Sequence, residues 1–327
     1  MGSGSFGDVV LAEDTKGNKV AIKEVKYNPK YPELTMTLER ETFLQQCEHE
    51  NIVKFIDYFQ SENSIIEKFE IHDLQCNTSK EPKFIEKVQE RKREKGTRQT
   101  YYILIIEYCD YEYCDLEKYI QSKQKPLSRD EILHFLKDIA QGLYYLHKEK
   151  RVVHRDLKPS NLMLKSNGEG NLPTVKISDL GFARKYTNEM DSLDGTKIYQ
   201  APEILRQRYD VKSPHKATTK YSPKCDLYSV GVILYYMATN NYPFSNQTNI
   251  FLTCIRKKTP CQIPIYVDID EYLEKLILGL VTHESETRLS WEQFFENEFV
   301  QEAMDIDKNR MDIEIVENDE NLESLND

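Results

Sequence analysis

The chain has 327 residues, of which 39% are hydrophobic and 30% charged, a composition typical of water-soluble globular proteins. Its net charge of −11 excludes nucleic acid as the main partner, because phosphate backbones bind basic surfaces. Seven scattered cysteines without a C-x-x-C pair disfavour disulfides and zinc sites, and they favour the cytoplasm, with the nucleus as an alternative. No apolar run approaches the ~20 residues of a transmembrane helix, and the start has no signal-peptide pattern.

The first sixty residues are expected to form strands around one helix. Residues 9–12 and 20–23 are short β-rich runs joined by a polar turn, which predicts a hairpin. A helix is expected over residues 34–46, and another strand over 52–59. Residues 64–100 are then dominated by charge. We interpret this insert as a solvated loop, with a docking surface for a regulatory partner as the alternative.

Order returns at residues 101–106, a continuous apolar run that is suited to a buried strand. Most of the chain beyond this run has helical patterning. A capping box at residues 128–131 precedes apolar residues at helical spacing. Residues 228–238 are apolar nearly all round, which predicts a buried helix, and further helices are expected over 273–281 and 291–299. The last residues, 301–327, carry ten acidic and two basic side chains and are expected to be a disordered acidic tail.

A G-x-G-x-x-G-x-V pattern occupies residues 2–9. Glycines allow main-chain N–H groups to approach phosphate oxygens closely, but this pattern also marks dinucleotide-binding turns. Such a turn would open a helix, whereas here a β-rich run follows. The next strand then carries Lys23, flanked by apolar residues, which favours a phosphate-binding role for this lysine.

The most specific motif is H-R-D-L-K-P-S-N at residues 154–161, followed by D-L-G at 179–181, G-T at 195–196 and A-P-E at 201–203. In order and spacing, these motifs resemble those of the eukaryotic protein kinases from residue 2 to about 300. The resemblance implies a bilobal α+β fold. Residues 1–108 would form a small antiparallel β-sheet lobe with one main helix, and residues 109–300 a larger, mostly helical lobe.

The resemblance also implies an ATP-dependent serine/threonine protein kinase, a transferase acting on protein hydroxyls. Asp156 would be the catalytic base, and Asn161 and Asp179 would hold Mg²⁺. Lys23 would position the ATP phosphates. Lys158 would contact the transferring phosphate, and in this family a lysine there marks the serine/threonine class. The ATP site would be completed by the glycine loop, the apolar residues around adenine, two main-chain positions and a ribose contact: Gly2, Gly4, Gly7, Val9, Ala21, Met163, Glu107, Cys109 and Asp115.

Regulation is expected to involve the activation segment. Arg155 would grip a phosphate there, on Ser192 or, as a second candidate, Thr187. Thr196 would instead bond to the catalytic loop directly. Glu41 is expected to pair with Lys23, although a one-residue shift would put Arg40 there, and Glu39 is a third candidate. As framework positions, Asp226 would anchor the catalytic loop and Arg288 would pair with Glu203.

The chain departs from the family pattern in several places. Leu180 replaces the usual phenylalanine, and it can fill the same apolar slot. The strand before the glycine loop is half missing, which favours a truncated N-terminus. A second, basic insertion spans residues 209–220 and is interpreted as a solvated loop.

The segments at residues 107–120 and 179–184 most resemble the autophagy-initiating kinases.

Two alternatives stay open. A pseudokinase would bind nucleotide or partners without turnover, but the residues at positions 23, 156, 161 and 179 that it would lose are all retained. A small-molecule kinase would not need the peptide platform of residues 195–203.

The sequence also bears on substrate preference. Ser160 and Tyr236 stand where arginine-selecting relatives carry acidic residues. Phe182 resembles the pattern that favours serine over threonine acceptors.

Overall fold

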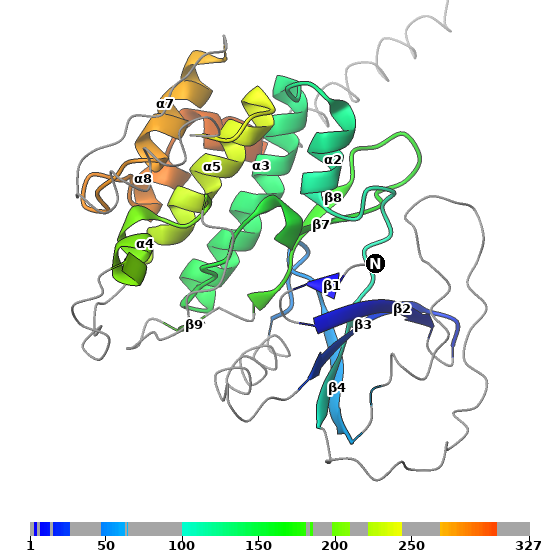
Figure 1. Ribbon diagram of the computed structural model, residues 1–327. Helices are drawn as coiled ribbons and strands as arrows, with labels where there is room; N and C mark the ends of the chain where they lie inside the picture. Colours follow the sequence, from blue (N-terminus) through cyan, green and yellow to red (C-terminus); the bar gives the residue numbers. More distant parts are fainter. Residues whose placement is uncertain are drawn as a thin grey trace, which may run out of the picture. The chain divides into compact units, whose positions relative to one another are not determined.

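The computed structural model describes residues 3–4, 7–13, 16–26, 47–62, 64, 100–180, 184–185, 198–209, 222–243 and 269–305 (Figure 1). The chain divides into two compact units. The first comprises Met1–Tyr119 and Tyr145–Thr187, and the second comprises Ile120–Tyr144 and Asn188–Asp327. This division differs from the predicted boundary at residue 108. The reason is that the hairpin after the catalytic loop is bonded to residues 51–53 of the strand-rich part.

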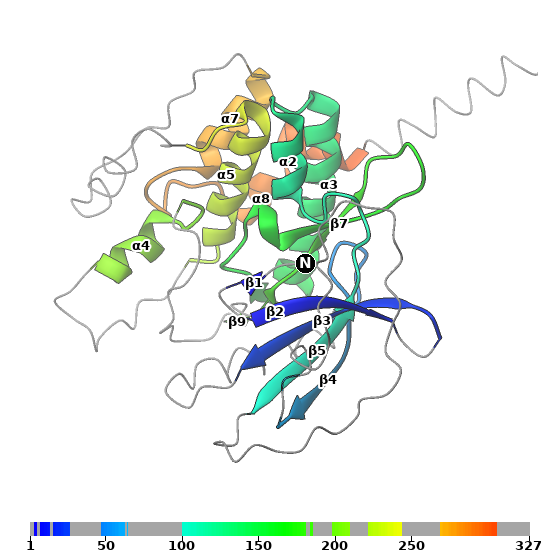
Figure 2. The same ribbon diagram turned by 45° about the vertical axis from the view of Figure 1, so that its right-hand side comes forward.

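The first unit contains a five-stranded antiparallel sheet in the order β1-β2-β3-β5-β4 (Figure 2). Its strands are β1 (Ser3–Gly4), β2 (Gly7–Glu13), β3 (Lys19–Lys26), β4 (Phe55–Ser61) and β5 (Tyr101–Glu107). The predicted β2–β3 hairpin is confirmed, with Val10 opposite Ile22. The interior strand β5, between β3 and β4, is the apolar run expected to be buried, and Ile103 and Leu104 have almost no exposed surface.

The rest of the first unit carries the catalytic motifs on short elements. A π-helical turn (Tyr145–Glu149) leads to β6 (Val152–Val153), which pairs with β9 (Arg184–Lys185). A 3₁₀ turn (Pro159–Asn161) then leads into the β7–β8 hairpin, formed by Leu162–Lys165 and Thr174–Ile177. Main-chain hydrogen bonds join this hairpin to the segment just before β4. Val53 donates to Ile177 (2.9 Å), and Ile177 donates to Asn51 (2.8 Å).

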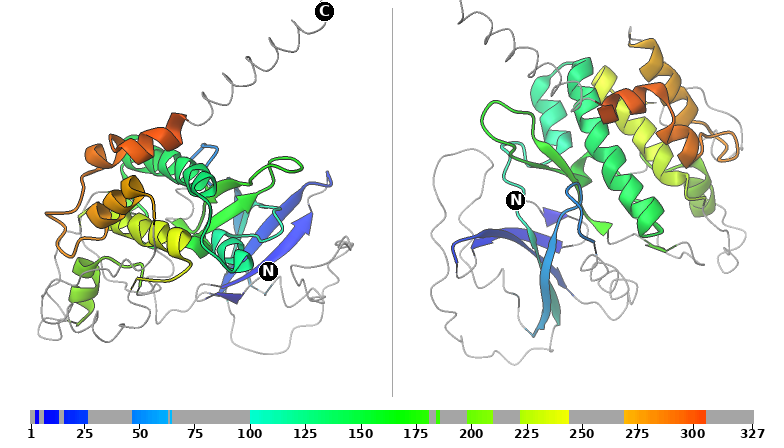
Figure 3. Two further views of the ribbon diagram at one scale, coloured as in Figure 1. Left: turned by 90° about the horizontal axis from the view of Figure 1, so that it is seen from above. Right: turned by 180° about the vertical axis from the view of Figure 1, so that it is seen from behind.

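The helices of the second unit pack around one buried helix, α5 (Cys225–Thr239), whose residues are all buried (Figure 3). Helix α3 (Arg129–Tyr144) and helix α7 (Glu271–Leu280) pack against it. The other helices are α4 (Pro202–Tyr209) and α8 (Trp291–Phe295), while α2 (Leu116–Lys123) spans the division between the units. Close packing explains why α5 is apolar on all sides, as its sequence predicted.

Gly231 marks the tightest approach between α5 and the end of α7. A Cβ at this position would lie 2.5 Å from Val281 Cγ2 and 2.7 Å from Leu280 Cβ. Any larger side chain would therefore push the two segments apart.

Side-chain caps define several helix starts. The predicted capping box before α3 is confirmed: the Glu131 N–H donates to Ser128 Oγ (3.3 Å), and the Ser128 N–H donates to Glu131 Oε2 (2.9 Å). A second capping box, between Ser290 and Gln293, starts α8. Within the described residues, no helix has the length and apolar character needed to cross a bilayer.

The ordered chain continues past residue 300, where a disordered tail was expected. Residues 301–305 are helical, and Ala303 is fully buried. Arg129 at the start of α3 donates to both carboxylate oxygens of Glu302, with Nη2 at 2.6 Å from Oε2, and its guanidinium lies 5.2 Å from the Phe299 ring centre. Residues 306–327 of the expected tail lie outside the described residues, as do 65–99 of the charged insert and the expected helix at 34–46.

Candidate active site

Lys23 is placed by the central part of the five-stranded sheet. It lies on β3, opposite Val9 on β2 and Leu104 on β5. Its ammonium Nζ lies 3.2 Å from Oδ1 of Asp179, 156 residues away in the chain. The side chains are 13% and 22% exposed, so this pair is only partly shielded from solvent. The strand lysine and the D-L-G aspartate therefore meet, a contact that the sequence analysis did not anticipate.

The catalytic loop is held in shape by its own side chains. His154 is completely buried, its Nε2 lies 2.9 Å from the Ser178 carbonyl, and its Nδ1 accepts from the Asp156 N–H (3.3 Å). Asn161 donates its amide to both the carbonyl and the carboxylate of Asp156, at 2.7 and 3.0 Å. A satisfied buried network of this kind fixes the direction in which Asp156 points.

Asp156 is the most buried carboxylate of the site, with 4% of its side chain exposed. Burial raises its pKa above the ordinary aspartate value, and the nearby Lys158 ammonium opposes that shift. Lys158 Nζ lies 2.9 Å from Asp156 Oδ2. The site thus holds a desolvated carboxylate against one cation, an arrangement suited to accepting a hydrogen bond from a hydroxyl.

Asp179 adopts a backbone conformation that aspartate visits only occasionally, with φ of +57°. The preceding residue fixes it, because Ser178 donates both its N–H and its hydroxyl to the Asn161 carbonyl, each at 2.9 Å. Burial acts to raise the pKa of Asp179, but the contact with Lys23, together with the nearby His154 and Lys158, outweighs it, and the pKa lies below the ordinary value. Arg155 also has a left-handed backbone, with φ of +74°. Such conformations are retained where surrounding contacts over-determine them.

The donor set around Asn161 and Asp179 fits a magnesium ion that shares its coordination with phosphate. Asn161 uses its amide NH₂ on Asp156, so the amide oxygen is directed elsewhere. The second oxygen donor is the Asp179 carboxylate. Its neighbour in the chain, Ser178, is bonded to the Asn161 carbonyl, which ties Asp179 to Asn161. No group of three or more His, Cys, Asp or Glu side chains that could hold a metal occurs among the described residues. Mg²⁺ commonly takes only one or two protein oxygens beside phosphates and water, so two suffice here.

Of the residues expected around adenine, Val9 and Ala21 lie on the paired strands β2 and β3, and Met163 lies on β7 of a separate sheet. Ala21 lies opposite Ile106, and Met163 on β7 forms a bridge with Asp115. No hydrogen bond engages the main chain of Cys109 within the described part of the chain, so its N–H and carbonyl are open to a ligand. The Glu107 N–H, by contrast, donates to the Lys54 carbonyl (2.8 Å). The Cys109 thiol is buried, which raises its pKa to about 12 and makes it unreactive.

Asp115 has a structural task that the sequence did not indicate. Its Oδ1 accepts from the Lys118 N–H (2.9 Å) at the start of α2, and its Oδ2 lies 3.1 Å from Lys118 Nζ. The side chain is buried. Its contact with ribose stays a prediction.

The glycine loop is described in part. Gly4 and Gly7 pair across the end of the β1–β2 hairpin, and Ser3 pairs with Asp8. Gly2, Glu41, Thr187, Ser192 and Thr196 lie outside the described residues.

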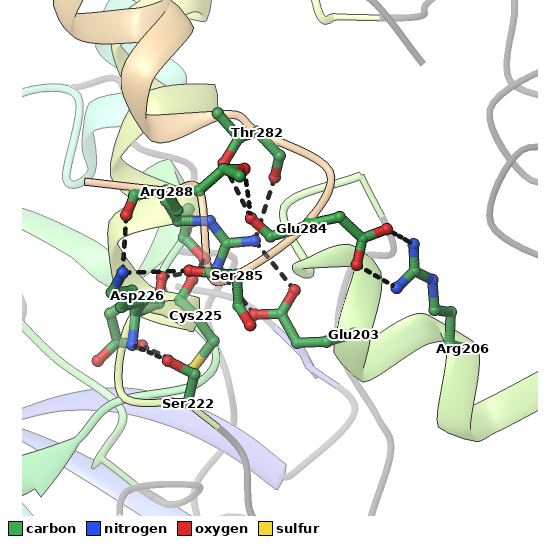
Figure 4. Close-up of polar contacts among 12 residues, drawn as sticks. Glu203, Arg206, Ser222, Cys225, Asp226, Thr282, Glu284, Ser285 and Arg288 are labelled. Carbon is green, nitrogen blue, oxygen red and sulfur yellow. Dashed lines mark hydrogen bonds and ion pairs between the residues drawn. The ribbon is translucent and has the colours of Figure 1, made fainter. Parts of the chain in front are cut away.

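The predicted pair of Glu203 and Arg288 is confirmed in the second unit (Figure 4). The two guanidinium Nη atoms bind the two carboxylate oxygens at 2.8 and 2.9 Å, and they also donate to the carbonyls of Lys224 and Thr282. The Arg288 side chain is completely buried. Asp226 is buried in the first turn of α5.

Sequence reasoning missed an ion cluster at the end of β5. The Glu107 carboxylate binds both Lys165, the last residue of β7, and Lys176, within β8. No local pattern in the sequence marks this cluster, because it joins residues from three different strands.

Comparisons with known proteins agree with this geometry. The family model described as "Protein kinase domain" matches residues 1–300. The chain is 30% identical to serine/threonine-protein kinase atg1 of Dictyostelium discoideum, over 92% of this chain and 38% of that protein. It is 31% identical to ATG1 of Debaryomyces hansenii (98% and 36%) and 29% identical to ATG1c of Arabidopsis thaliana (95% and 36%). The chain thus spans less than two fifths of these relatives, whose names support the subgroup resemblance noted in the sequence.

Proposed function

Because the chain belongs to the protein kinase family, we propose that it transfers the γ-phosphate of ATP to serine or threonine hydroxyls of protein substrates. We further propose that it works as one of the autophagy-initiating kinases, in the cytoplasm. One observation carries the catalytic proposal. Residues from three separate places in the sequence are joined by contacts: Lys23 binds Asp179, Asp156 binds Lys158 and Asn161 within the catalytic loop, and Ser178, next to Asp179, donates to the Asn161 carbonyl.

Each side chain has a distinct part in the proposed reaction. Asp156 accepts the hydrogen bond of the substrate hydroxyl, orients its oxygen toward the γ-phosphorus and takes its proton. Lys158, already 2.9 Å from Asp156, offsets charge on the transferring phosphate. Lys23 binds the α- and β-phosphates, releasing its contact with Asp179. Asn161 and Asp179 would hold Mg²⁺, which would neutralise part of the phosphate charge when bound.

The base of ATP is proposed to lie between Val9 and Ala21 on one side and Met163 on the other. The main-chain groups of Glu107 and Cys109 would bind its edge, with the Cys109 groups open for this purpose. The glycine loop, including Gly2, Gly4 and Gly7, would cover the phosphates. Asp115 would reach the ribose by exchanging part of its cap on α2 for the ribose hydroxyls.

A pseudokinase, which would bind nucleotide or partners without turnover, is the alternative. The two proposals differ in turnover alone. Labelled ATP, Mg²⁺ and an arrayed peptide library test them together with the acceptor preference. Phosphorylated serine or threonine peptides support the enzyme, whereas nucleotide binding without any transfer supports the pseudokinase.

Substrate choice is proposed not to depend on arginine. Tyr236 is buried and stacks on Tyr242, with ring centres 4.3 Å apart, so this position offers no carboxylate to an arginine. Ser160 is likewise uncharged. Serine is proposed as the preferred acceptor on the basis of Phe182, which lies outside the described residues. Dominant arginine selection in the same peptide array would refute the first of these statements.

Activation is proposed to follow phosphorylation of Ser192, with Thr187 as the second candidate. Arg155 would bind the new phosphate, because a guanidinium forms a strong fork with phosphate oxygens. Thr196 would bond to Asp156 and Lys158, and Glu41 would pair with Lys23 in the active state. Phosphosite mapping of active protein, with Ser192→Ala kinetics, tests this: full activity of the variant, with Ser192 unmodified in active wild type, would rule the switch out.

A further inference from the structure

The Glu107 carboxylate is the centre of an ion cluster at the end of β5, in which Lys165 is partly exposed. Its Oε1 is in direct contact with Lys165 Nζ, and its Oε2 lies 3.1 Å from Lys176 Nζ. The Lys54 N–H also donates to Oε2, at 3.1 Å. The Glu107 and Lys176 side chains are 14% and 11% exposed, so these two charges are largely removed from water. Both carboxylate oxygens are therefore used.

The cluster joins four segments that are distant in sequence. Glu107 ends β5, Lys165 ends β7, Lys176 lies on β8, and Lys54 precedes β4. Lys176 makes a further bond, donating to the Glu50 carbonyl at 2.7 Å. No other acidic side chain contacts Lys165 or Lys176 within the described residues, so Glu107 is the counter-charge that both of them share.

The electrostatics agree with a tightly held carboxylate. Burial acts to raise the pKa of Glu107, but its bonds from Lys165, from the Lys54 N–H and from Lys176 outweigh burial, and the pKa lies below the ordinary value. A buried charge of this kind is costly to leave half-paired. The chain therefore keeps an ionised side chain on the strand whose main chain is proposed to meet adenine.

The segments that meet at Glu107 carry the proposed nucleotide contacts. Residues 107–115 run beside β7, with Tyr111 donating to the Leu164 carbonyl (3.2 Å) and Leu164 donating to the Cys114 carbonyl (2.9 Å). Met163 lies on β7 between these contacts and the catalytic loop. Lys176 lies three residues before Asp179, and Ile177 between them is fixed by Asn51 and Val53.

We infer that the Glu107 side chain is a positioning group for nucleotide binding, clamping the adenine-binding main chain to the β7–β8 hairpin through Lys165 and Lys176. The inference rests on the proposed function, since it concerns the same ATP site. The clamp sets the spacing between the main chain of residues 107–109, Met163 under the base, and the strand that leads to Asp179. Glu107 acts on the nucleotide's position through its side chain, at a distance from the reacting atoms.

The consequence is a selective loss of nucleotide affinity when the charge is removed. Glu107→Gln keeps the size of the side chain and one acceptor oxygen, but it removes the negative charge that Lys165 and Lys176 share. We expect the Kd for MgATP to rise about tenfold, and the KM for ATP to rise equally, because small misplacements of binding groups weaken affinity strongly. The kcat at saturating ATP should stay within about twofold, since Asp156 and Lys158 are untouched.

The experiment is a calorimetric titration of MgATP into wild type, Glu107→Gln, Lys176→Met and the double variant, at a temperature well below each unfolding midpoint. Glu112→Gln is the matched control, an exposed glutamate five residues along the same segment. The double variant should bind no more weakly than the worse single variant, because both remove the same clamp. Lys165→Met gives an independent measurement should Lys176→Met fold poorly.

An unchanged Kd in Glu107→Gln would overturn the inference. So would a raised kcat at unchanged Kd, which would mean that the cluster restrains the enzyme and does not position its nucleotide. These outcomes are separable from failure of the proposed function. A wild type that binds MgATP but transfers no phosphate refutes the kinase proposal alone, and its Kd values still decide the role of Glu107.

Discussion

The ion pairs of the two units are built differently, although each joins a base to a carboxylate. In the second unit, Arg288 binds Glu203 with two bonds, its two Nη atoms also donate to two carbonyls, and its side chain has no exposed surface. In the first unit, Lys23 touches one oxygen of Asp179, and Lys158 touches one oxygen of Asp156.

The difference separates ion pairs that leave a carboxylate oxygen available to a ligand from those that do not. A guanidinium fork that uses both carboxylate oxygens leaves nothing for a ligand, so the Arg288 pair is closed and structural. An ammonium is a compact charge that leaves an oxygen available, so the lysine pairs can exchange partners with phosphate, metal or a hydroxyl. Single substitutions test this contrast, from the largest expected effect to the smallest.

Asp179→Asn should have the largest effect on turnover. It removes the carboxylate that Lys23 binds, together with the charge of one of the two proposed Mg²⁺ ligands. We expect kcat to fall by about 1000-fold or more, and the Mg²⁺ dependence of ATP binding to weaken. Steady-state kinetics and binding at several Mg²⁺ concentrations measure both. Glu169→Gln, an exposed change in the β7–β8 turn, should alter neither.

Arg288→Met should instead damage stability. It removes the fully buried partner of the half-buried Glu203 carboxylate, which costs about 3–5 kcal/mol of the free energy of unfolding. Chemical denaturation measures the loss. Arg206→Met is the control, because Arg206 binds Glu284 with the same two-bond fork, yet 46% of the Glu284 side chain is exposed. That variant should lose only about 0–1 kcal/mol, and equal losses would remove the distinction.

The residues in these two experiments could be found from the sequence alone. Motifs identified Lys23, Asp156, Asn161 and Asp179, because the proposed chemistry requires those side chains at those spacings. Glu203 and Arg288 were found in the same way. The β2–β3 hairpin, the buried strand β5 and the helix α5 followed from hydrophobic patterning.

Contacts set by the folded arrangement could not be found in that way. The Glu107 cluster depends on how β5 lies beside the β7–β8 hairpin, and no local pattern encodes it. The bond from Arg129 to Glu302 spans 173 residues, so the acidic composition after residue 300 suggested disorder where the chain is folded. The closeness of Gly231 to Val281 is likewise a property of packing.

Lys158→Met should change both the rate and its pH dependence. Lys158 opposes the effect of burial on the pKa of Asp156, so its loss should raise that pKa further. Asp156 must be ionised to accept the hydroxyl proton, and activity falls as pH drops through its pKa. The acid limb of the kcat profile should therefore move to higher pH, with kcat lowered about 100-fold at neutral pH. An acid limb that stays in place would separate Lys158 from Asp156.

Gly231→Ala should give the smallest effect, and only on stability. The added Cβ would collide with Val281 and Leu280, costing about 1–3 kcal/mol of the free energy of unfolding. Gly279→Ala is the comparison, since its Cβ would meet only the Leu289 side chain, at 3.0 Å. Thermal unfolding should rank Gly231→Ala below Gly279→Ala, and the reverse order would contradict the packing described for α5.

The most direct test of the open carboxylates is Asp156→Asn, measured for MgATP binding and for phosphoryl transfer to a peptide in the same preparation. Asp156 is proposed to act on the substrate hydroxyl alone, while Lys23, Asn161 and Asp179 hold the nucleotide. The account predicts a Kd within about twofold of wild type, with transfer reduced by about 1000-fold or more. Transfer at the wild-type rate, or an equal loss of binding and transfer, would contradict it.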